Sequence, residues 1–301
     1  MFSLIRSVRQ FLRGIGAVSA AIVLLAACNS SDYRPGSPPE DGFSVMSLNI
    51  HYLVPENDGS DWNRRKHAVA AAVEELSPEV LLFQEMETFS GGHAPQENRQ
   101  LDWVLQEHPS YAVGAYGDPK EFPITQPILY NPDRFAPVDQ GFFFFSDTPD
   151  RLYAEPWDGS WPAFASWVVL DDRTTGRLVA VYNVHLDAYS RQNRRRGAAL
   201  TARRIASRSP AGSAVIVAGD LNVRRRSAIL EPLRDLGLVL MDTEGSSFHF
   251  GRGWHLFGAI DHIFHDESLS VLEGGVIQRA WAGTWPSDHH PIVAVFRWTT
   301  P

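Results

Sequence analysis

The stretch Ala214-Val215-Ile216-Val217-Ala218-Gly219-Asp220-Leu221-Asn222 decides the fold class. Its apolar first half is typical of a strand that is buried on both faces, and Asp220 and Asn222 follow where such a strand turns into a loop. An Asp and an Asn at this place often only cap a turn. Loops after buried strands are also where α/β enzymes place their catalytic groups. The stretch therefore predicts an α/β domain and leaves a turn or a functional site open at its end.

Other predicted strands have polar residues at their ends as well. The runs 43–48, 79–83 and 177–184 are strand-like, as are 260–264 and 292–296. Shorter strands are expected at 111–113, 128–130, 142–145, 164–170 and near 239, and helices at 62–76, 96–107, 191–207 and 227–236. The polar residues at these ends are Asn49, Glu85, Asn183, His185, Asp261, Asp288 and His289.

If the fold brings these residues together, they form a pocket of carboxylates, amides and imidazoles. Oxygen ligands of this kind suit a hard divalent cation such as Mg²⁺ or Mn²⁺. A thiolate site is excluded because the chain has one cysteine. Zinc is disfavoured because the histidines lack the H-E-x-x-H spacing. Each residue taken singly has a structural explanation, such as an ion pair or a turn cap, so the argument depends on the whole set.

The order of six short motifs is more specific than any one of them. The motifs are Ser-Leu-Asn-Ile (47–50), Phe-Gln-Glu (83–85), Asn-x-His-Leu-Asp (183–187), Gly-Asp-Leu-Asn (219–222), Ile-Asp-His-Ile-Phe (260–264) and Ser-Asp-His-His-Pro (287–291). The series resembles the endonuclease/exonuclease/phosphatase superfamily from about Phe43 to Arg297. The resemblance implies a four-layer α/β/β/α sandwich, with two packed mixed β-sheets and helices outside. It also implies hydrolysis of phosphate esters with Mg²⁺ or Mn²⁺.

The resemblance assigns roles to the polar strand ends. The metal ligands would be Asn49, Glu85 and Asp288. The residues that orient water, hold the phosphate or move a proton would be His185, Asp220, Asn222, Asp261 and His289, with Asp261 fixing the tautomer of His289. Asn183 would bind the scissile phosphate beside His185.

The expected substrate is a phosphate ester, namely a nucleic acid, a nucleotide or a phospholipid headgroup. A phosphodiesterase or nuclease acting by in-line attack of water is the first hypothesis. A phosphomonoesterase or lipid-headgroup hydrolase is the second, and a non-catalytic binding lipoprotein is the third. Ala163, Ala188 and His262 replace residues that a similar bacterial branch tends to have, so the substrate contacts are expected to differ. The run Arg224, Arg225 and Arg226 is interpreted either as a phosphate-binding group at the pocket mouth or as a solvated loop.

The N-terminal residues 1–27 are predicted to be a lipoprotein signal peptide. Three arginines precede the apolar run 15–27, which is too short to span a membrane, and Leu25-Ala26-Ala27-Cys28 resembles a bacterial lipobox. Cys28 would then be lipidated, residues 28–41 would form a flexible tether, and residues 42–301 would form the catalytic domain. The lipid would anchor the protein in the bacterial cell envelope, and because residue 29 is Asn and not Asp, resemblance to the sorting signal of enteric bacteria implies the outer membrane. We expect a monomer.

The composition supports one sizeable domain. The chain has 301 residues, of which 44% are hydrophobic, so its core is large enough to fold without disulfides. Its 27 basic and 35 acidic residues give a net charge of −8. That balance argues against a protein that coats nucleic acid through its overall charge.

Overall fold

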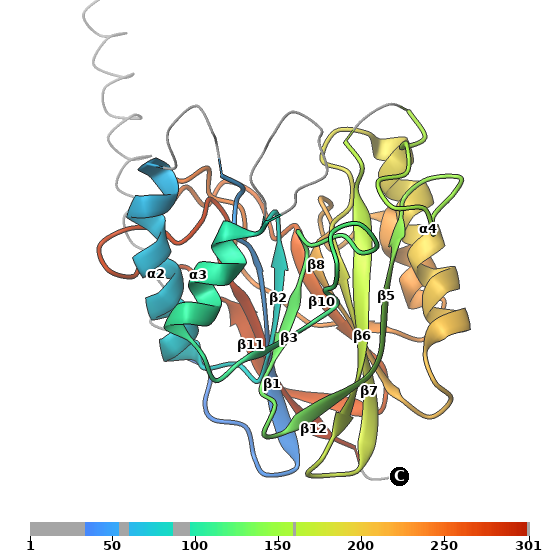
Figure 1. Ribbon diagram of the computed structural model, residues 1–301, viewed down its shortest axis with the longest axis horizontal. Coiled ribbons are helices and arrows are strands. Elements are labelled where there is room, and N and C mark those ends of the chain that lie inside the picture. The colour runs from blue at the N-terminus through green and yellow to red at the C-terminus, as the bar shows by residue number, and fades with distance from the viewer. Residues whose placement is uncertain (1–33, 54–59, 87–96, 159–160, 300–301) are drawn as a thin grey trace, which may run out of the picture.

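The computed structural model describes residues 34–53, 60–86, 97–158 and 161–299 (Figure 1). The predicted signal peptide and the lipidation site Cys28 therefore lie outside the described residues. In the part of the chain that is described, no helix has the length and apolarity that crossing a membrane requires.

Two six-stranded sheets form the centre of the molecule. The first has the spatial order β11 (Leu269–Val276), β12 (Ile292–Trp298), β1 (Gly42–Asn49), β2 (Val80–Gln84), β4 (Ile128–Tyr130) and β3 (Ala112–Gly114). The second has the order β5 (Phe135–Phe144), β6 (Phe164–Asp172), β7 (Arg177–Val184), β8 (Ala214–Asp220), β10 (Asp261–His265) and β9 (Val239–Leu240). Both sheets are mixed, because β1 pairs with β2 and β7 with β8 in parallel while the other pairs are antiparallel.

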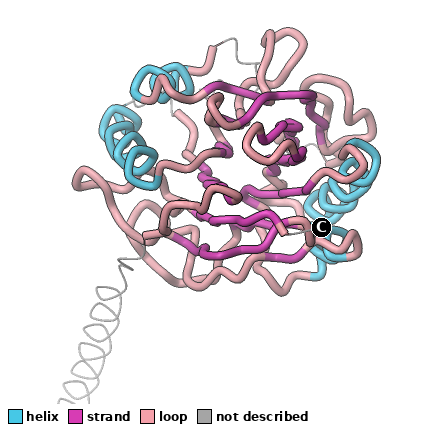
Figure 2. The backbone as a smooth tube through the Cα atoms, turned by 90° about the horizontal axis from the view of Figure 1, so that it is seen from below, coloured by secondary structure: helices cyan, strands magenta, loops and turns pink. Residues whose placement is uncertain are grey.

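Helices cover the outer face of each sheet (Figures 1 and 2). Helices α2 (Ser60–Leu76) and α3 (Arg99–Glu107) pack on the first sheet. Helix α4 (Arg191–Arg208) packs on the second, together with a short 3₁₀ turn (Ala228–Leu230) and α5 (Glu231–Arg234). The predicted four-layer α/β/β/α sandwich is confirmed.

The central strands are buried on both faces because each is covered by two layers. In β8, Ile216 and Ala218 pack between the sheets, whereas Val217 between them points to the helices of the second sheet. In β1, Val45 faces the other sheet and Met46 faces α2 and α3. Because both faces are covered, the sequences of these strands are continuous apolar runs and lack the alternation of polar and apolar residues that a half-exposed strand shows.

The sequence patterns missed parts of the two sheet edges. Strand β11 was not predicted, and β5 begins at Phe135 although we expected a strand only from residue 142. Both lie at an edge of their sheet and carry a bulge, between Val271 and Glu273 in β11 and between Pro137 and Asp139 in β5. Edge strands often carry polar residues, Pro and bulges, so their periodicity is weak. The helix predicted over 227–236 is instead the 3₁₀ turn followed by one turn of α-helix.

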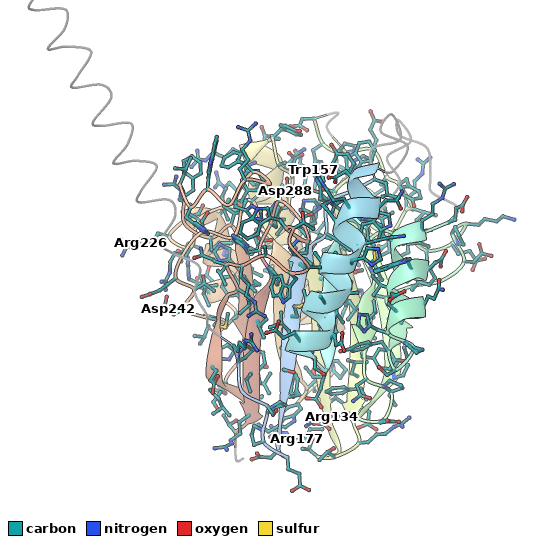
Figure 3. The ribbon with its side chains drawn as sticks, turned by 90° about the vertical axis from the view of Figure 1, so that its left-hand side faces the viewer. Arg134, Trp157, Arg177, Arg226, Asp242 and Asp288 are labelled. Carbon is teal, nitrogen blue, oxygen red and sulfur yellow. The ribbon has the colours of Figure 1, made fainter. Side chains whose placement is uncertain are left out.

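A buried ion-pair network joins the two sheets at the end of the sandwich that holds Arg134 in Figure 3. Asp172 of β6 accepts hydrogen bonds from Arg134 Nε (3.2 Å) and NH2 (3.0 Å) and from Trp298 Nε1 of β12 (2.8 Å). Arg134 also donates to Glu79, which precedes β2 (3.3 Å). Asp172 is fully buried, so water cannot replace these hydrogen-bond donors if they are lost.

Asp172→Asn is therefore expected to lower the free energy of unfolding by about 3 kcal/mol, since it removes the fully buried carboxylate that pairs with Arg134 and leaves that guanidinium only Glu79 at 3.3 Å. Burial alone would raise the pKa of Asp172, but the hydrogen bonds from Arg134 and Trp298 outweigh it and lower that pKa. A lowered folded-state pKa gives stability that is full above the unfolded value of about 3.9 and is lost as the pH falls through the folded value. Urea titrations at pH 7 and in the acid range measure both effects.

The matched control is Asp171→Asn, because the half-buried side chain of Asp171 makes none of these hydrogen bonds. Equal stability of the two variants at pH 7 would contradict a stabilising role for the network.

Candidate active site

The polar strand ends that the sequence singled out gather at the opposite end of the sandwich. Asn49 and Asp220 end β1 and β8, while Asp261 begins β10 directly opposite Asp220 in the antiparallel register. Glu85 and His185 follow β2 and β7. Parallel pairing of β1 with β2 and of β7 with β8 brings their carboxyl ends to one edge of each sheet, and packing of the sheets brings the two edges together.

The backbone is strained at three of these strand ends. His51, Glu85 and Asn222 have φ values of 62°, 55° and 50°, in the left-handed region that non-glycine residues seldom adopt. Such residues cost about 1–3 kcal/mol each and cluster at functional sites. Here the left-handed residues turn the chain sharply where each strand ends.

One glycine allows β7 and β8 to approach each other at the site. Gly219 has a φ of 143°, and a Cβ at this position would lie 2.0 Å from the carbonyl oxygen of Val184. A side chain there would separate the two strands, so glycine is required for the contact between Asp220 and His185.

Asn49, Glu85, His185 and Asp220 form the centre of the cluster. Asn49 Nδ2 donates to Glu85 Oε1 (2.9 Å) and to Asp220 Oδ2 (3.1 Å), so it links the two carboxylates. His185 Nε2 lies 3.7 Å from each of the same two oxygens. Burial alone would raise the pKa of Glu85, but the hydrogen bond from His51 and the charge of His185 outweigh it and lower that pKa to about 2. Glu85 is therefore an anion at every physiological pH.

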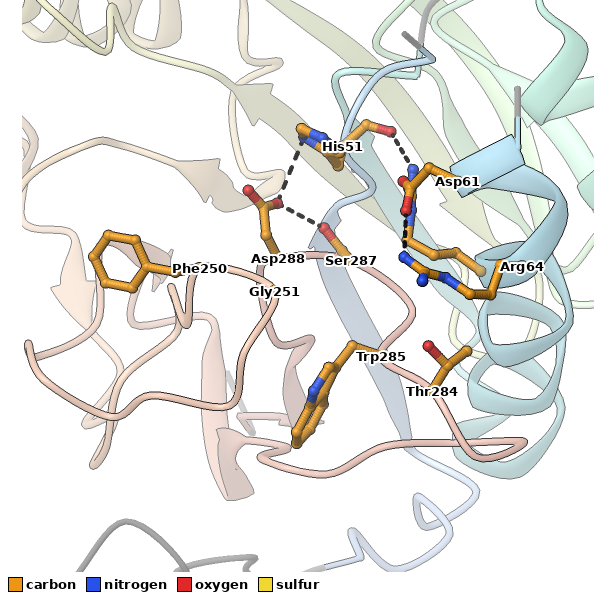
Figure 4. A pocket seen from close by; sticks show the side chains of 10 residues that line it. His51, Asp61, Arg64, Phe250, Gly251, Thr284, Trp285, Ser287 and Asp288 are labelled. Carbon is orange, nitrogen blue, oxygen red and sulfur yellow. Dashed lines mark hydrogen bonds and ion pairs between the residues drawn. The ribbon is translucent and has the colours of Figure 1, made fainter. Parts of the chain in front are cut away.

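His51 connects Glu85 to Asp288, and sequence reasoning missed it. Its Nδ1 lies 3.7 Å from Glu85 Oε2 and 3.7 Å from Asp288 Oδ1, so both carboxylates approach this nitrogen, and Figure 4 shows the contact with Asp288. Burial alone would lower the pKa of His51, but Glu85 and Asp288 raise it. The sequence did contain a signal for His51, because it lies two residues after Asn49, in the loop that follows a strand predicted to end at the site.

Arg65 of α2 holds this loop and was also missed. Its NH1 donates to the carbonyl oxygens of Ile50 (2.7 Å) and Pro286 (2.8 Å), which joins the loop after β1 to the loop before Asp288. Arg65 is 5% exposed. Arg65 lies on the same stripe of the helix as Val69 and Val73. An arginine on a helix stripe that is otherwise apolar was the sequence signal for its buried, bridging role.

His289, Asp261 and Asp220 form a buried line on the second sheet. His289 Nδ1 lies 2.8 Å from Asp261 Oδ2, and His289 Nε2 lies 3.7 Å from Asp220 Oδ2. Burial alone would lower the pKa of His289, but the charges of Asp261 and Asp220 raise it well above its ordinary value. Burial, with the charge of Asp261, raises the pKa of Asp220 to about 6. The line thus contains a protonated imidazole beside a carboxylate that can accept a proton near neutral pH.

Asn222 and Ser287 fix the loops around this line. The backbone N–H of Asn222 donates to Asp220 Oδ1 (2.9 Å), and its Nδ2 donates to the carbonyl oxygen of Leu186 (2.8 Å). Ser287 Oγ donates to the carbonyl oxygen of Asn49 (2.6 Å) and accepts from the backbone N–H of His289 (3.1 Å). Asn222 therefore orients Asp220 mainly through its backbone.

Asn183 does not join the cluster, contrary to the prediction that it binds the phosphate. It is fully buried between the sheets, where its Nδ2 donates to the carbonyl oxygens of Phe83 (2.8 Å), Pro127 (3.2 Å) and Gln126 (3.3 Å). Its Oδ1 accepts from Gln84 Nε2 (2.7 Å). Both ends of the amide are occupied, so Asn183 joins the two sheets instead of contacting a substrate.

The arginine run differs from the interpretation that placed all three guanidinium groups at the pocket mouth. Arg225 pairs with Asp242, and Figure 3 shows Arg226 pointing outward, away from Asp288. Arg224 packs over the ring of Phe257, with 5.4 Å between its Cζ and the ring centroid. Among the residues the structure describes, none of the three lines the pocket beside the cluster.

That pocket has a volume of about 630 Å³ and opens next to Asp288 (Figure 4). Phe250 lies on one side of it and Arg64 on the other, with Asp288 and Ser287 between them. Arg64 is paired with Asp61 at 3.0 Å. The pocket is mostly polar and is large enough for a mononucleotide or a sugar phosphate.

The donor atoms fit a hard divalent cation. Glu85 and Asp288 offer carboxylate oxygens that each lie 3.7 Å from His51 Nδ1, and the low pKa of Glu85 keeps its oxygens free of protons. Asp220, Asp261 and His289 also have ligand atoms within 4.8 Å of one another. In that second group the raised pKa of His289 favours the imidazolium, which has no lone pair for a metal. The pKa of His51, between Glu85 and Asp288, is raised as well, so on that side the two carboxylates and not the imidazole would be the ligands.

Comparison with solved structures finds several of the same fold. An endonuclease/exonuclease/phosphatase family protein from Bacteroides thetaiotaomicron is 23% identical and has a TM-score of 0.72, over 88% of this chain and all of that chain. A mannosyl-6-phosphatase from the same species is 22% identical with a TM-score of 0.71, over 85% of this chain and all of that one. TDP2 from D. rerio, solved with a single-strand DNA product, is 15% identical with a TM-score of 0.62, over 85% of this chain and 99% of that chain.

At these identities the likeness establishes the fold alone. None of the curated proteins compared with this chain matches it. A model of the Endonuclease/Exonuclease/phosphatase family matches residues 46–289, which include every polar strand end described above. The chain belongs to the Endonuclease/Exonuclease/phosphatase family.

Proposed function

We propose that the protein is a divalent-metal-dependent phosphoesterase that hydrolyses its substrate by in-line attack of water on phosphorus. The observation that carries this proposal is the line Asp261–His289–Asp220, with contacts of 2.8 and 3.7 Å, beside the permanently anionic Glu85. The line supplies a proton acceptor and a cationic hydrogen-bond donor in one buried place, and phosphoryl transfer needs both.

In the proposed mechanism Asp220 and His289 have different roles. Their facing atoms are 3.7 Å apart, too close to stand on opposite faces of one phosphorus atom. Asp220 therefore accepts the proton of the attacking water, while Nε2 of the His289 imidazolium donates to a non-bridging phosphate oxygen. Asp261 holds the imidazolium through Nδ1, and Asn222 holds Asp220 through its backbone N–H. The new P–O bond forms to water as the ester P–O bond breaks on the opposite face.

The metal would be held by Glu85 and Asp288, with Asn49 and His51 around them. A bound divalent cation supplies Lewis-acid stabilisation of the phosphate and of the leaving oxygen. Asn49 holds Glu85 at 2.9 Å, and Arg65 fixes the loops that carry His51 and Asp288. These residues keep the two carboxylates on His51 Nδ1, 3.7 Å from each.

The substrate is proposed to be a phosphodiester, with a phosphomonoester as the second candidate. The likeness of the fold to a mannosyl-6-phosphatase supports the second candidate. A screen of bis-p-nitrophenyl phosphate, p-nitrophenyl phosphate, single-stranded DNA, sphingomyelin and phosphoinositides, with Mg²⁺, with Mn²⁺ and with EDTA, tests the proposal. Metal-dependent release from at least one ester is expected. Absence of hydrolysis of all of them with either metal would contradict it.

We also propose that Cys28 carries the lipid anchor, on the strength of the lipobox-like sequence alone. Cys28→Ala is expected to move the protein from the membrane fraction to the soluble fraction of a bacterial host, because the acyl chains can no longer be attached. Fractionation followed by immunoblotting measures the change. A variant that stays fully processed and membrane-bound would exclude this anchor.

A further inference from the structure

Three aromatic side chains are exposed together beside the pocket. Phe250, Trp254 and Phe257, here called the aromatic rim, are 40%, 41% and 45% exposed. Single exposed apolar side chains need no explanation, but a contiguous group marks a binding surface. The ring centroid of Phe250 lies 6.2 Å from that of Trp254 and 6.0 Å from that of Phe257, so the rim is contiguous.

The rim is attached directly to the catalytic loop. Phe248 packs on the ring of His289 with 4.9 Å between centroids, and on Phe250 with 4.4 Å. The backbone N–H of His249 donates to the carbonyl oxygen of Asp288 (2.9 Å), and Phe248 pairs with His289 in an antiparallel bridge. A ligand seated on the rim would therefore hold a fixed position relative to His289.

Phe250 is the member of the rim that lines the pocket, and its backbone is strained. Its φ is 60°, again in the left-handed region, which indicates that the surrounding structure imposes its position. The other two rings each have a guanidinium beside them, with Arg224 over Phe257 at 5.4 Å and Arg252 over Trp254 at 4.9 Å. Aromatic and arginine planes side by side are the surfaces on which nucleobases stack.

We propose, building on the phosphoesterase function above, that the aromatic rim binds the planar base of a nucleotide ester whose phosphate lies at Asp220 and His289. The rest of the pocket favours this ligand over an acyl chain, because Asp61, Arg64, Thr284 and Ser287 line it with polar groups. A ribose offers hydroxyls to such groups, whereas an acyl chain would remove them from water without hydrogen bonds.

Calorimetric titration of the full chain in Mg²⁺ with adenosine 5′-monophosphate and with ribose 5-phosphate tests the proposal. The two ligands share the sugar phosphate and differ in the base. The nucleotide is expected to bind about tenfold more tightly, or more, because only it can stack. Phe250→Leu is expected to remove that preference and leave the affinity for ribose 5-phosphate unchanged, whereas Phe250→Tyr retains the preference. Leu272→Ala, which changes an exposed apolar side chain on β11, is the matched control.

Equal affinities for the two ligands in the unaltered protein would overturn the proposal, as would a preference that survives Phe250→Leu. Turnover of bis-p-nitrophenyl phosphate by the same preparation separates the two claims, since hydrolysis without a base preference leaves the phosphoesterase function standing. Vesicles of phosphatidylcholine and phosphatidylglycerol provide the competing case. Binding to them that depends on Phe250 and Trp254, with no nucleotide preference, would assign the rim to a membrane and overturn the proposal.

Discussion

His289→Gln is expected to lower kcat by about 10²–10³-fold, with little change in KM. The imidazolium of His289 is buried beside Asp220 and paired with Asp261, so its hydrogen bond reaches full strength only when charge develops on the phosphate oxygens. Loss of one preorganised donor of this kind has a cost of that size. Steady-state kinetics on whichever ester is hydrolysed, with thermal melting to verify folding, measures the effect.

The matched control for this variant is His67→Gln, since His67 is an exposed histidine of α2 that packs on Trp103. Asp261→Asn is expected to act through His289 and not on the substrate. It should therefore reduce kcat and shift the pH profile, whereas a merely structural defect would change only the melting temperature. Unchanged kcat in His289→Gln would contradict the role given to this residue.

Glu85→Gln is expected to lower kcat/KM by about 10³-fold or more, because the variant loses an anionic ligand of the proposed metal site. The unaltered protein should also melt at a higher temperature in Mg²⁺ or Mn²⁺, since an ion that binds only the folded state stabilises it by mass action. In Glu85→Gln that shift should disappear. Differential scanning fluorimetry across a metal titration provides this readout without turnover.

Glu74→Gln is the control, because Glu74 is an exposed carboxylate on α2. A Glu85→Gln variant that keeps both its metal-induced melting shift and its turnover at limiting metal would make Glu85 a structural residue.

Local sequence patterns predicted most of the strands and the polar residues at their ends, whereas the four-layer sandwich was implied by the resemblance of the motif series to the superfamily. A strand covered on both faces reads as a continuous apolar run, and a polar residue at its end stands out from that run, as Asp220 does at the end of β8. The edge strand β11 was not predicted, because it is partly exposed and carries a bulge that interrupts its sequence pattern. Its pairing is fixed by the neighbouring β12, which a local pattern does not contain.

The details of the site depend on contacts between distant residues and were harder to predict. Arg65 bridges Ile50 and Pro286, although Pro286 lies 221 positions further along the chain than Arg65. His51 is brought to Asp288 by the pairing of β1 with β12. Asn183 shows the opposite error. Its motif placed it near the phosphate, but the alternation of side chains along β7 turns it between the sheets, where Gln84 and Phe83 bind it.

In the proposed mechanism, Asp220 activates water for attack on phosphorus. Hydrolysis of bis-p-nitrophenyl phosphate in ¹⁸O-labelled water with Mg²⁺, followed by mass spectrometry of both products, tests it most directly. We predict one ¹⁸O atom in p-nitrophenyl phosphate, none in p-nitrophenol, and loss of the reaction in Asp220→Asn. Label in the p-nitrophenol, or an Asp220→Asn variant that hydrolyses the diester as fast as the unaltered protein, would contradict the claim.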